Sequence, residues 1–190
     1  MSVVVMYGCG DDTDTSIIRT FAARGARVVL TGGDSEAVER LAHEAPAAAG
    51  AVTTVQVDPY DAAAVDRHLA SVIRSAGQVD VCCSFVAVPT SISSVPVAVP
   101  GSVRPTFVPP YFLPARLAAN HMIAHGSGAI LVVSDRAGHD ADAIEPAWVV
   151  KQALVRNLAE ECEPHNVVVV DLPAPVTADA VTSWWPAFSR

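Results

Sequence analysis

Valine-rich apolar runs alternate with amphipathic segments along almost the whole chain, and this alternation limits the possible folds more than any other feature. The apolar runs are continuous, which is typical of parallel strands covered on both faces. The segments between them have helical spacing and follow after short links. The pattern predicts an α/β fold with a doubly wound parallel sheet of about six strands and helices on both faces.

Six predicted strands share the valine-rich character: Ser2–Tyr7, Ala26–Thr31, Ala51–Val57, Val79–Ala87, Gly128–Ser134 and Val167–Leu172. Five predicted helices lie between them: about Thr15–Arg24, Ser35–Glu44, Asp61–Ala76, Tyr111–His125 and Pro146–Glu163. Two stretches break the alternation. Residues 88–110 are rich in proline and predict an irregular loop, and residues 173–190 form a tail with two tryptophans. The chain of 190 residues is expected to form one domain, 1–190.

Charge and composition exclude several classes of partner. The net charge is −8 and the basic residues are scattered, which argues against nucleic acid and anionic membranes. No apolar run approaches the ~20 residues that span a bilayer. The chain enters its first strand without a basic leader, so we expect a cytoplasmic protein. The four cysteines lack metal-ligand spacing and are expected to be buried thiols.

The stretch YGCGDDTDTSI lies between the first predicted strand and helix, where nucleotide-binding α/β domains place a glycine-rich phosphate loop. Three aspartates, Asp11, Asp12 and Asp14, occupy this turn. They can cap the helix themselves. At ~5 Å each carboxylate would repel a phosphate by roughly 3 kcal/mol. The loop is therefore expected to reject a diphosphate, unless Mg²⁺ bridges the aspartates to it.

Several stretches together resemble the short-chain dehydrogenase/reductase family over nearly the whole chain. The matching segments are ARGARVVLTGGDSEAVERLA, VTTVQVDPYDAAAVDRHL, GQVDVCCSFVAV, GSGAILVVSDRAG and AWVVKQALVRNLAEECEPHNVVVVDLPAPV. The resemblance implies a Rossmann-like domain with a truncated carboxyl end, because the family's further helix and seventh strand have no counterpart. It also implies that Asp58 stands where the family contacts the adenine of NAD(P).

The cofactor loop departs from the family pattern. The family's Thr-Gly-x-x-x-Gly-x-Gly falls on Tyr7, Gly8, Asp12 and Asp14, so one glycine of three is kept. The later glycines allow close approach of the backbone to the diphosphate. The resemblance thus places a cofactor site at Gly8, Asp12, Asp14 and Asp58, and the departures predict that it is defunct. No cofactor is expected, with NAD(P) as the alternative.

The catalytic positions depart as well. The family's serine falls on Asp135, beside Ser134, and its tyrosine falls on Ala147. Only the lysine matches, at Lys151, which is the single lysine of the chain. Lys151, Asp135 and Ser134 are therefore expected to be a vestigial catalytic set. Asp135 and Lys151 could form an acid–base pair or a residual salt bridge.

A weaker resemblance links the modified loop and the aromatic segment WWPAF to halohydrin dehalogenases, relatives that dropped the nucleotide. Their Ser-Tyr-Arg set falls on Asp135, Ala147 and Lys151, which does not support dehalogenation. His121 and His125 have the spacing of two metal ligands on one helix, but no third ligand is evident. No metal site is expected.

Three functions remain open. The first is a non-catalytic subunit that supports an active short-chain oxidoreductase, or pairs with itself, through the helices starting near Tyr111 and Pro146. The second is a cofactor-independent enzyme, of lyase, dehalogenase or cyclase type, that reuses the vacant cleft with Asp12, Ser134, Asp135 and Lys151. The third is an NAD(P)-dependent oxidoreductase.

Overall fold

A six-stranded parallel sheet forms the centre of the protein. The computed structural model describes residues 1–10, 13, 15–45, 52–85, 95–97, 106–134, 146–173 and 180. The strand order is β3-β2-β1-β4-β7-β8, and every neighbouring pair in this sheet is parallel. The strands are β1 (Val3–Tyr7), β2 (Arg27–Gly32), β3 (Val52–Gln56), β4 (Val81–Ser84), β7 (Gly128–Ser134) and β8 (Val167–Pro173). The predicted doubly wound sheet is confirmed.

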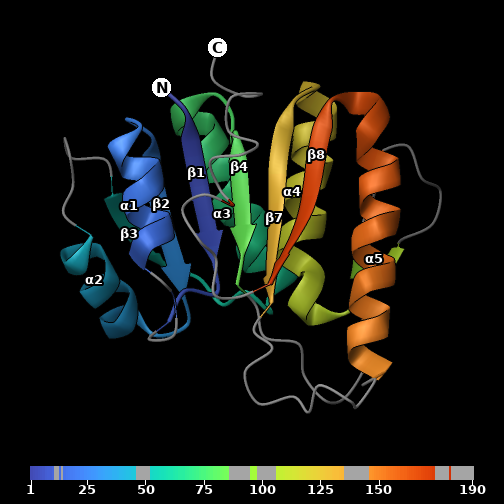
Figure 1. Cartoon of the computed structure of the whole chain (residues 1–190), viewed down its shortest axis with the longest axis horizontal. Helices are drawn as coiled ribbons and strands as arrows, with labels where there is room; N and C mark the ends of the chain where they lie inside the picture. The colour runs from blue at the N-terminus through green and yellow to red at the C-terminus, as the bar shows by residue number, and fades with distance from the viewer. Residues whose placement is uncertain are drawn as a thin grey trace.

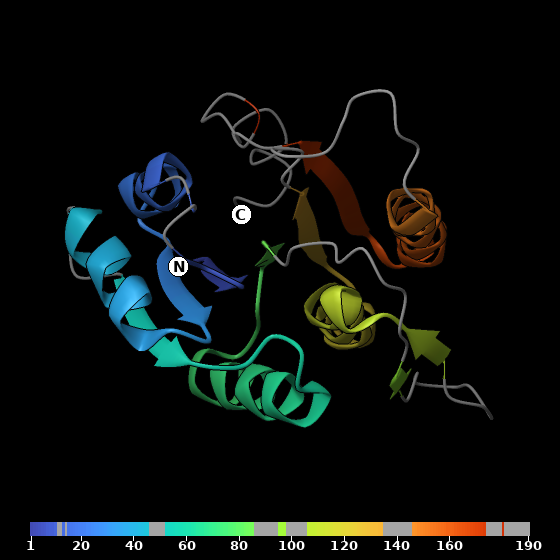
Figure 2. The same ribbon diagram turned by 90° about the horizontal axis from the view of Figure 1, so that it is seen from below.

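Helices cover both faces of the sheet (Figure 1). Figure 2 shows α1 (Thr15–Ala23) and α2 (Ser35–Glu44) on one face. The opposite face carries α3 (Ala62–Ala76), α4 (Leu113–His125) and α5 (Pro146–Cys162). Short 3₁₀ turns, η1 (Pro110–Phe112) and η2 (Glu163–His165), precede α4 and follow α5.

Two apolar clusters, one on each face, hold these layers together. Alternate residues of β1 point to opposite sides, so Val5 joins the cluster under α3–α5 and Met6 joins the cluster under α1 and α2. In the same way, the neighbouring residues Cys82 and Cys83 lie in different clusters, Cys82 under α3–α5 and Cys83 under α1 and α2. All four cysteines are free and buried.

Local signals explain where the helices begin and end. The side chain of Asp34 accepts hydrogen bonds from two backbone N–H groups at the start of α2, and Asp61 does the same for α3. Gly77 and Gly126 end α3 and α4 with φ values of 90° and 81°, which favour glycine. No helix in the described ranges is long and apolar enough to cross a bilayer.

Two described segments of the predicted irregular loop 88–110 are strands and not irregular. These segments, β5 (Val95–Val97) and β6 (Thr106–Val108), form a two-stranded antiparallel sheet. Val97 and Val108 are buried against the cluster under α4, so β-branched side chains outweigh the proline content. In the predicted tail, Pro173 belongs to β8, and Ala180 packs against the cluster on the α1 face.

Candidate functional site

The sheet reverses its winding direction between β1 and β4, which is the point where open α/β sheets usually bind ligands. From β1 the chain passes outward through β2 to β3, and β4 then adds on the other side of β1. Tyr7 and Ser84 are register partners at the carboxyl ends of β1 and β4. The N–H group of Phe85 donates to the carbonyl of Tyr7 at 2.8 Å. A candidate site therefore lies just beyond these two strand ends.

Backbone N–H groups of the loop after β1 donate hydrogen bonds to acceptors in the same chain. The N–H group of Cys9 donates to the carbonyl oxygen of Thr31 at 2.9 Å. The N–H group of Gly10 donates to the hydroxyl of Thr13 at 2.9 Å, and the N–H group of Thr13 returns a bond of 2.9 Å to the carbonyl of Gly10. A phosphate-binding loop needs such N–H groups to point at the ligand. In this conformation three of them are committed within the chain.

Two glycines let the loop lie against β2. Gly8, the one retained family glycine, has a φ of 76°. A Cβ on Gly32 would meet the carbonyl oxygen of Cys9 and would lie 2.8 Å from Cγ2 of Val38. The absence of a side chain at Gly32 thus allows the loop to approach β2 closely, and the hydrogen bonds above hold it there.

Asp11, Asp12 and Asp14 lie outside the described residues. Their effect on an approaching phosphate stays a prediction. Separately, three described N–H groups of the loop, those of Cys9, Gly10 and Thr13, already have acceptors within the chain.

Asp58, the predicted adenine contact, stabilises a turn. Its carboxylate accepts the N–H group of Tyr60 at 2.9 Å, and its carbonyl accepts the N–H group of Asp61 at 3.2 Å. The residue is exposed at the carboxyl end of β3. These two hydrogen bonds stabilise the turn that leads into α3, and one carboxylate oxygen of Asp58 accepts one of them.

Lys151 is almost completely buried and forms an ion pair. Its ammonium group donates to Oδ1 of Asp171 at 2.6 Å, linking α5 to β8. The side chain of Lys151 is 1% exposed and that of Asp171 is 31% exposed. The predicted partner, Asp135, lies outside the described residues, so its pairing with Lys151 stays a prediction. The partner that the structure describes is on β8.

The other predicted catalytic positions are placed only by their backbone. Ser134 ends β7, where it pairs in register with Pro173. Ala147 lies in the first turn of α5, one turn before Lys151. The chain holds three tyrosines, at positions 7, 60 and 111, so α5 carries none.

A buried pair that sequence reasoning missed lies beneath the same edge. The hydroxyl of Tyr7 and Nδ1 of His68 on α3 are 2.7 Å apart, and the rings meet edge to face at 5.6 Å between centroids. Burial raises the pKa of Tyr7, and Cys82 and Asp66 raise it further. Burial lowers the pKa of His68. Nε2 of His68 is buried and has no hydrogen-bond partner.

A buried arginine is also engaged internally. Arg116 on α4 is 4% exposed and makes a bidentate contact with Glu161 on α5, at 2.6 and 2.7 Å. It also donates to Asn120 at 2.6 Å. These charge-assisted contacts bind α4 to α5.

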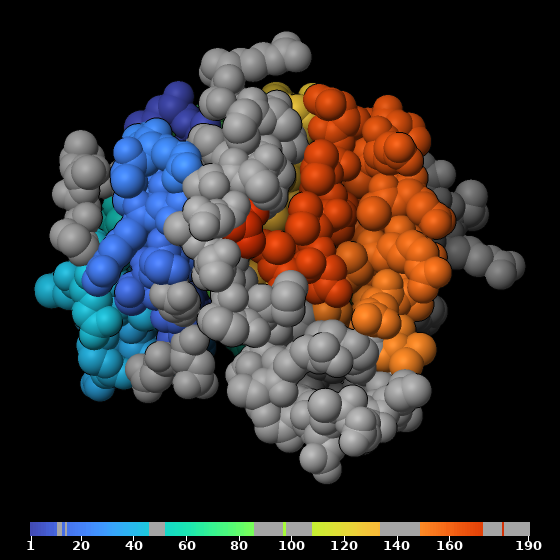
Figure 3. Space-filling model, viewed as in Figure 1, coloured from blue at the N-terminus to red at the C-terminus, as the bar shows by residue number. Residues whose placement is uncertain are grey.

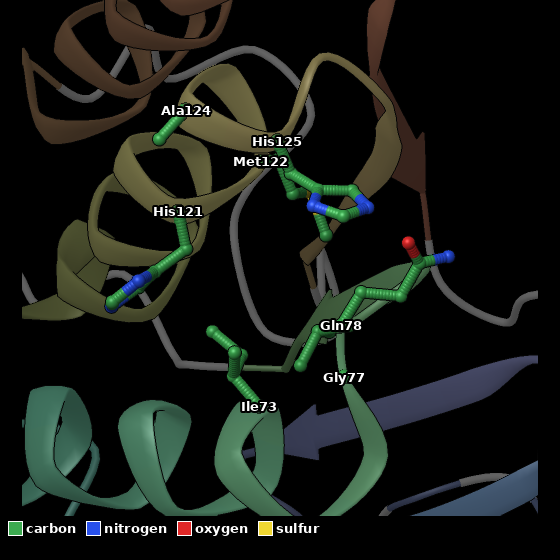
Figure 4. A pocket seen from close by; sticks show the side chains of 8 residues that line it. Ile73, Gly77, Gln78, His121, Met122, Ala124 and His125 are labelled. Carbon is green, nitrogen blue, oxygen red and sulfur yellow. The ribbon is translucent and has the colours of Figure 1, made fainter.

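The histidine pair on α4 lines a pocket at the opposite edge of the sheet. This pocket of about 230 Å³ lies between the ends of α3 and α4, and Gln78 contributes to it. Figure 4 shows the rings of His121 and His125 pointing away from each other. His121 contacts Asp66 at 3.2 Å. Among the described residues no three candidate ligands come together to hold a metal ion.

The geometry can be set beside known proteins. A family model described as short chain dehydrogenase matches residues 2–187. The chain belongs to the short-chain dehydrogenase family. Within this family, meso-2,3-butanediol dehydrogenase of Serratia marcescens is 35% identical over 79 residues, which cover 42% of this chain and 31% of that protein. The match thus spans about a third of that curated relative's length.

Solved structures show the same fold. A metagenomic short-chain oxidoreductase in complex with NADP has a TM-score of 0.68 and 24% identity, covering 100% of this chain and 91% of the other. A short-chain dehydrogenase from Rhodopseudomonas palustris has a TM-score of 0.71 and 21% identity, covering 100% and 92%. At these identities the likeness establishes the fold.

Two functional-looking groups have no signal in the sequence. Asp171 sits in a valine run that reads as a buried strand, and only the register of β8 places it opposite α5. His68 falls within an ordinary amphipathic helix, and its contact with Tyr7 joins residues 61 positions apart. Contacts of this range depend on the assembled sheet.

Proposed function

We propose that this short-chain dehydrogenase family member is a non-catalytic subunit that supports an active relative by association. It does not transfer hydride by itself. The hydrogen bonds of the loop after β1 carry this proposal. In this loop the N–H groups of Cys9, Gly10 and Thr13 donate to acceptors within the chain. A diphosphate bound by these three N–H groups would have to displace their present hydrogen bonds.

The residues at the family's catalytic positions also support a non-catalytic role. Hydride transfer in this family needs a phenol to move a proton beside the lysine, and α5 has no tyrosine. Alanine at position 147 can neither donate nor accept a proton. The remaining lysine, Lys151, is paired with Asp171 at 2.6 Å.

A surface suited to association lies on α5 and β8. These elements are side by side at one side of the molecule (Figure 3). On α5, Val149 is 48% exposed, and the polar residues Gln152 and Arg156 are exposed as well. On β8, Val168 is 39% exposed. Such mixed surfaces are typical of non-obligate interfaces. The amino-terminal part of α4 is buried by its own chain.

Cofactor binding can be measured directly. A ligand at about 100 times its Kd stabilises the folded state by about 2.7 kcal/mol, which is roughly 5–10 °C in Tm for a chain of this size. We expect no shift with NADH or NADPH, with or without Mg²⁺. A shift of several degrees with either nucleotide alone would contradict the proposal. A shift that needs Mg²⁺ would show that the aspartates bridge a metal to the diphosphate.

Association can be tested with a matched pair of variants. The purified protein is mixed with a full-length short-chain dehydrogenase from the same cells and analysed by native mass spectrometry. We expect a complex that Val168→Glu weakens at least tenfold. Val55→Glu is the control, because Val55 is 40% exposed on β3 at the far edge of the sheet. Equal effects of the two variants, or no complex with relatives or itself, would refute the association.

The second candidate is an NAD(P)-dependent oxidoreductase. Family membership over residues 2–187 and the NADP complex of a structural neighbour favour it, and both count against the expectation that no cofactor binds. The nucleotide titration above separates the two candidates. The cofactor-independent enzyme is distinguished by a small molecule that co-purifies with the protein while the nucleotides give no shift.

A further inference from the structure

The pocket between the ends of α3 and α4 lies at the edge of the sheet opposite the candidate site. Its volume is about 230 Å³, and its apolar walls are formed by Ile73, Val79 and Met122, of which the last two are buried. Since one water occupies about 30 Å³ of the liquid, this volume has room for roughly eight non-hydrogen atoms. An aromatic ring with a short substituent is a body of this size that matches the walls.

The polar side chains of the pocket offer hydrogen-bond acceptors. The amide nitrogen of Gln78 donates to the carboxylate of Asp80, so its oxygen Oε1 is left as an acceptor. Nε2 of His121 lies 3.2 Å from Oδ1 of Asp66. A carboxylate only accepts, so the neutral ring of His121 carries its proton on Nε2 and leaves Nδ1 as an acceptor. The neutral ring of His125 also has one acceptor nitrogen.

The charges around the pocket are negative. Gly77 and His125, at the carboxyl-terminal ends of α3 and α4, both line it. The carboxyl-terminal end of a helix carries partial negative charge and favours a cation. The carboxylates of Asp66 and Asp80 add to this charge, because each contacts a side chain of the lining. The surroundings therefore favour a positively charged donor and disfavour a carboxylate ligand.

The acceptors lie on both sides of the apolar floor. In Figure 4 the side chain of Ile73 lies between His121 on one side and the side chains of Gln78 and His125 on the other. The two imidazole rings point away from each other, so they are not arranged to share one metal ion. A ring seated over Ile73 has an acceptor of the lining on either side.

We infer that this pocket binds a small organic ammonium ion, whose apolar body rests on the apolar walls and whose N–H groups donate to Gln78 and the imidazoles. The inference goes beyond the proposed function. The pocket shares no described residue with the loop after β1 or with α5 and β8. A failure of either proposal therefore leaves the other intact.

Benzylammonium chloride is the probe, since it joins one aromatic ring to one ammonium group and has about the size that the pocket admits. It is titrated into the folded protein while the ring C–H signals of the histidines are followed by NMR, with ammonium chloride as the reference for ionic strength. We expect saturable shifts at His121 and His125 and none at His43 or His165. Benzyl alcohol and benzoate should bind about tenfold more weakly, because they lack the positive charge.

A matched pair of variants tests the role of the acceptors. His125→Leu keeps a side chain of similar size at the exposed end of α4 but removes one acceptor, so benzylammonium should bind about fivefold more weakly. His165→Leu is the control, since His165 is equally an exposed histidine but lies in η2, outside the pocket. It should retain the wild-type affinity.

Several results would overturn the inference. Absence of saturable shifts at His121 and His125 in the wild type would do so without any variant, as would shifts of equal size at His43 or His165. Benzoate or benzyl alcohol that binds as tightly as benzylammonium would show that the pocket does not select an ammonium group. Equal affinities of His125→Leu and His165→Leu would show that the imidazole of His125 accepts no bond from the ligand.

Discussion

Replacing Tyr7 by phenylalanine tests the buried contact between β1 and α3 most directly. The wild-type hydroxyl lies 2.7 Å from Nδ1 of His68, whose Nε2 already lacks a partner. Tyr7→Phe would leave both ring nitrogens unsatisfied in the core. A buried polar atom without a partner costs about 1–3 kcal/mol. We expect a loss near 2 kcal/mol, or about 4–8 °C in Tm.

Urea unfolding of a double-mutant cycle provides the measurement. His68→Leu and Tyr7→Phe should each destabilise the protein, and the double variant should lose about 1 kcal/mol less than the sum, because it removes both polar partners together. Tyr60→Phe is the control, since Tyr60 is 46% exposed, and it should change stability by less than about 0.5 kcal/mol. Additive effects, or a Tyr7→Phe protein as stable as the wild type, would refute the reasoning.

The same residue gives the fold a dependence on pH. Burial lowers the pKa of His68, so the unfolded chain binds a proton more readily than the folded chain. This contribution to stability is complete above about pH 6.5 and is lost as the pH falls through the folded pKa. The stability of the wild type relative to the Tyr7→Phe, His68→Leu double variant should therefore stay constant from about pH 8 to pH 6.5 and fall from about pH 6.5 to pH 5. A constant difference over this range would show that His68 does not titrate differently on folding.

Three further outcomes follow from other contacts. Gly32→Ala should cost about 1–3 kcal/mol in urea unfolding, because its Cβ would meet the carbonyl of Cys9; Gly33→Ala is the control, with no atom within 4 Å of the added Cβ. Asp34→Ala should cost about 1 kcal/mol by removing the cap of α2, and Asp34→Asn should retain most of the stability. Burial raises the pKa of Cys9 and of Cys82 to about 12, so a thiol reagent at about pH 8 should modify them only after urea is added. Rapid modification of the folded protein would contradict that burial.

The fold could be predicted from sequence because its signals are local. Continuous valine runs mark strands covered on both faces, and Asp34 marks the start of α2 at the predicted residue. The short sheet of β5 and β6 was missed because Pro96 and its neighbours carry turn signals, while the burial that favours pairing comes from α4. Tertiary packing, and not local sequence preference, determines the strand conformation of β5 and β6.

The candidate site could be predicted only in outline. Resemblance to the family located Gly8, Asp58 and Lys151 near the carboxyl ends of the strands, and the structure gives each a described contact or conformation. It could not supply Asp171, because a single aspartate in a valine run has no recognisable spacing to a lysine 20 positions earlier. Nor could it reveal that Thr13 binds the N–H group of Gly10.

The central place of β1 has a consequence for the order of assembly. β1 pairs with β2 on one side and β4 on the other, so the first strand of the described sheet to be synthesised joins the two halves of that sheet. The N–H group of Val3 also donates to the carboxylate of Asp80 at 2.6 Å, which ties the start of β1 to the entrance of β4. The growing chain must therefore keep one side of β1 open until β4 has left the exit tunnel. A chain released before that point would expose an unpaired valine strand to its neighbours.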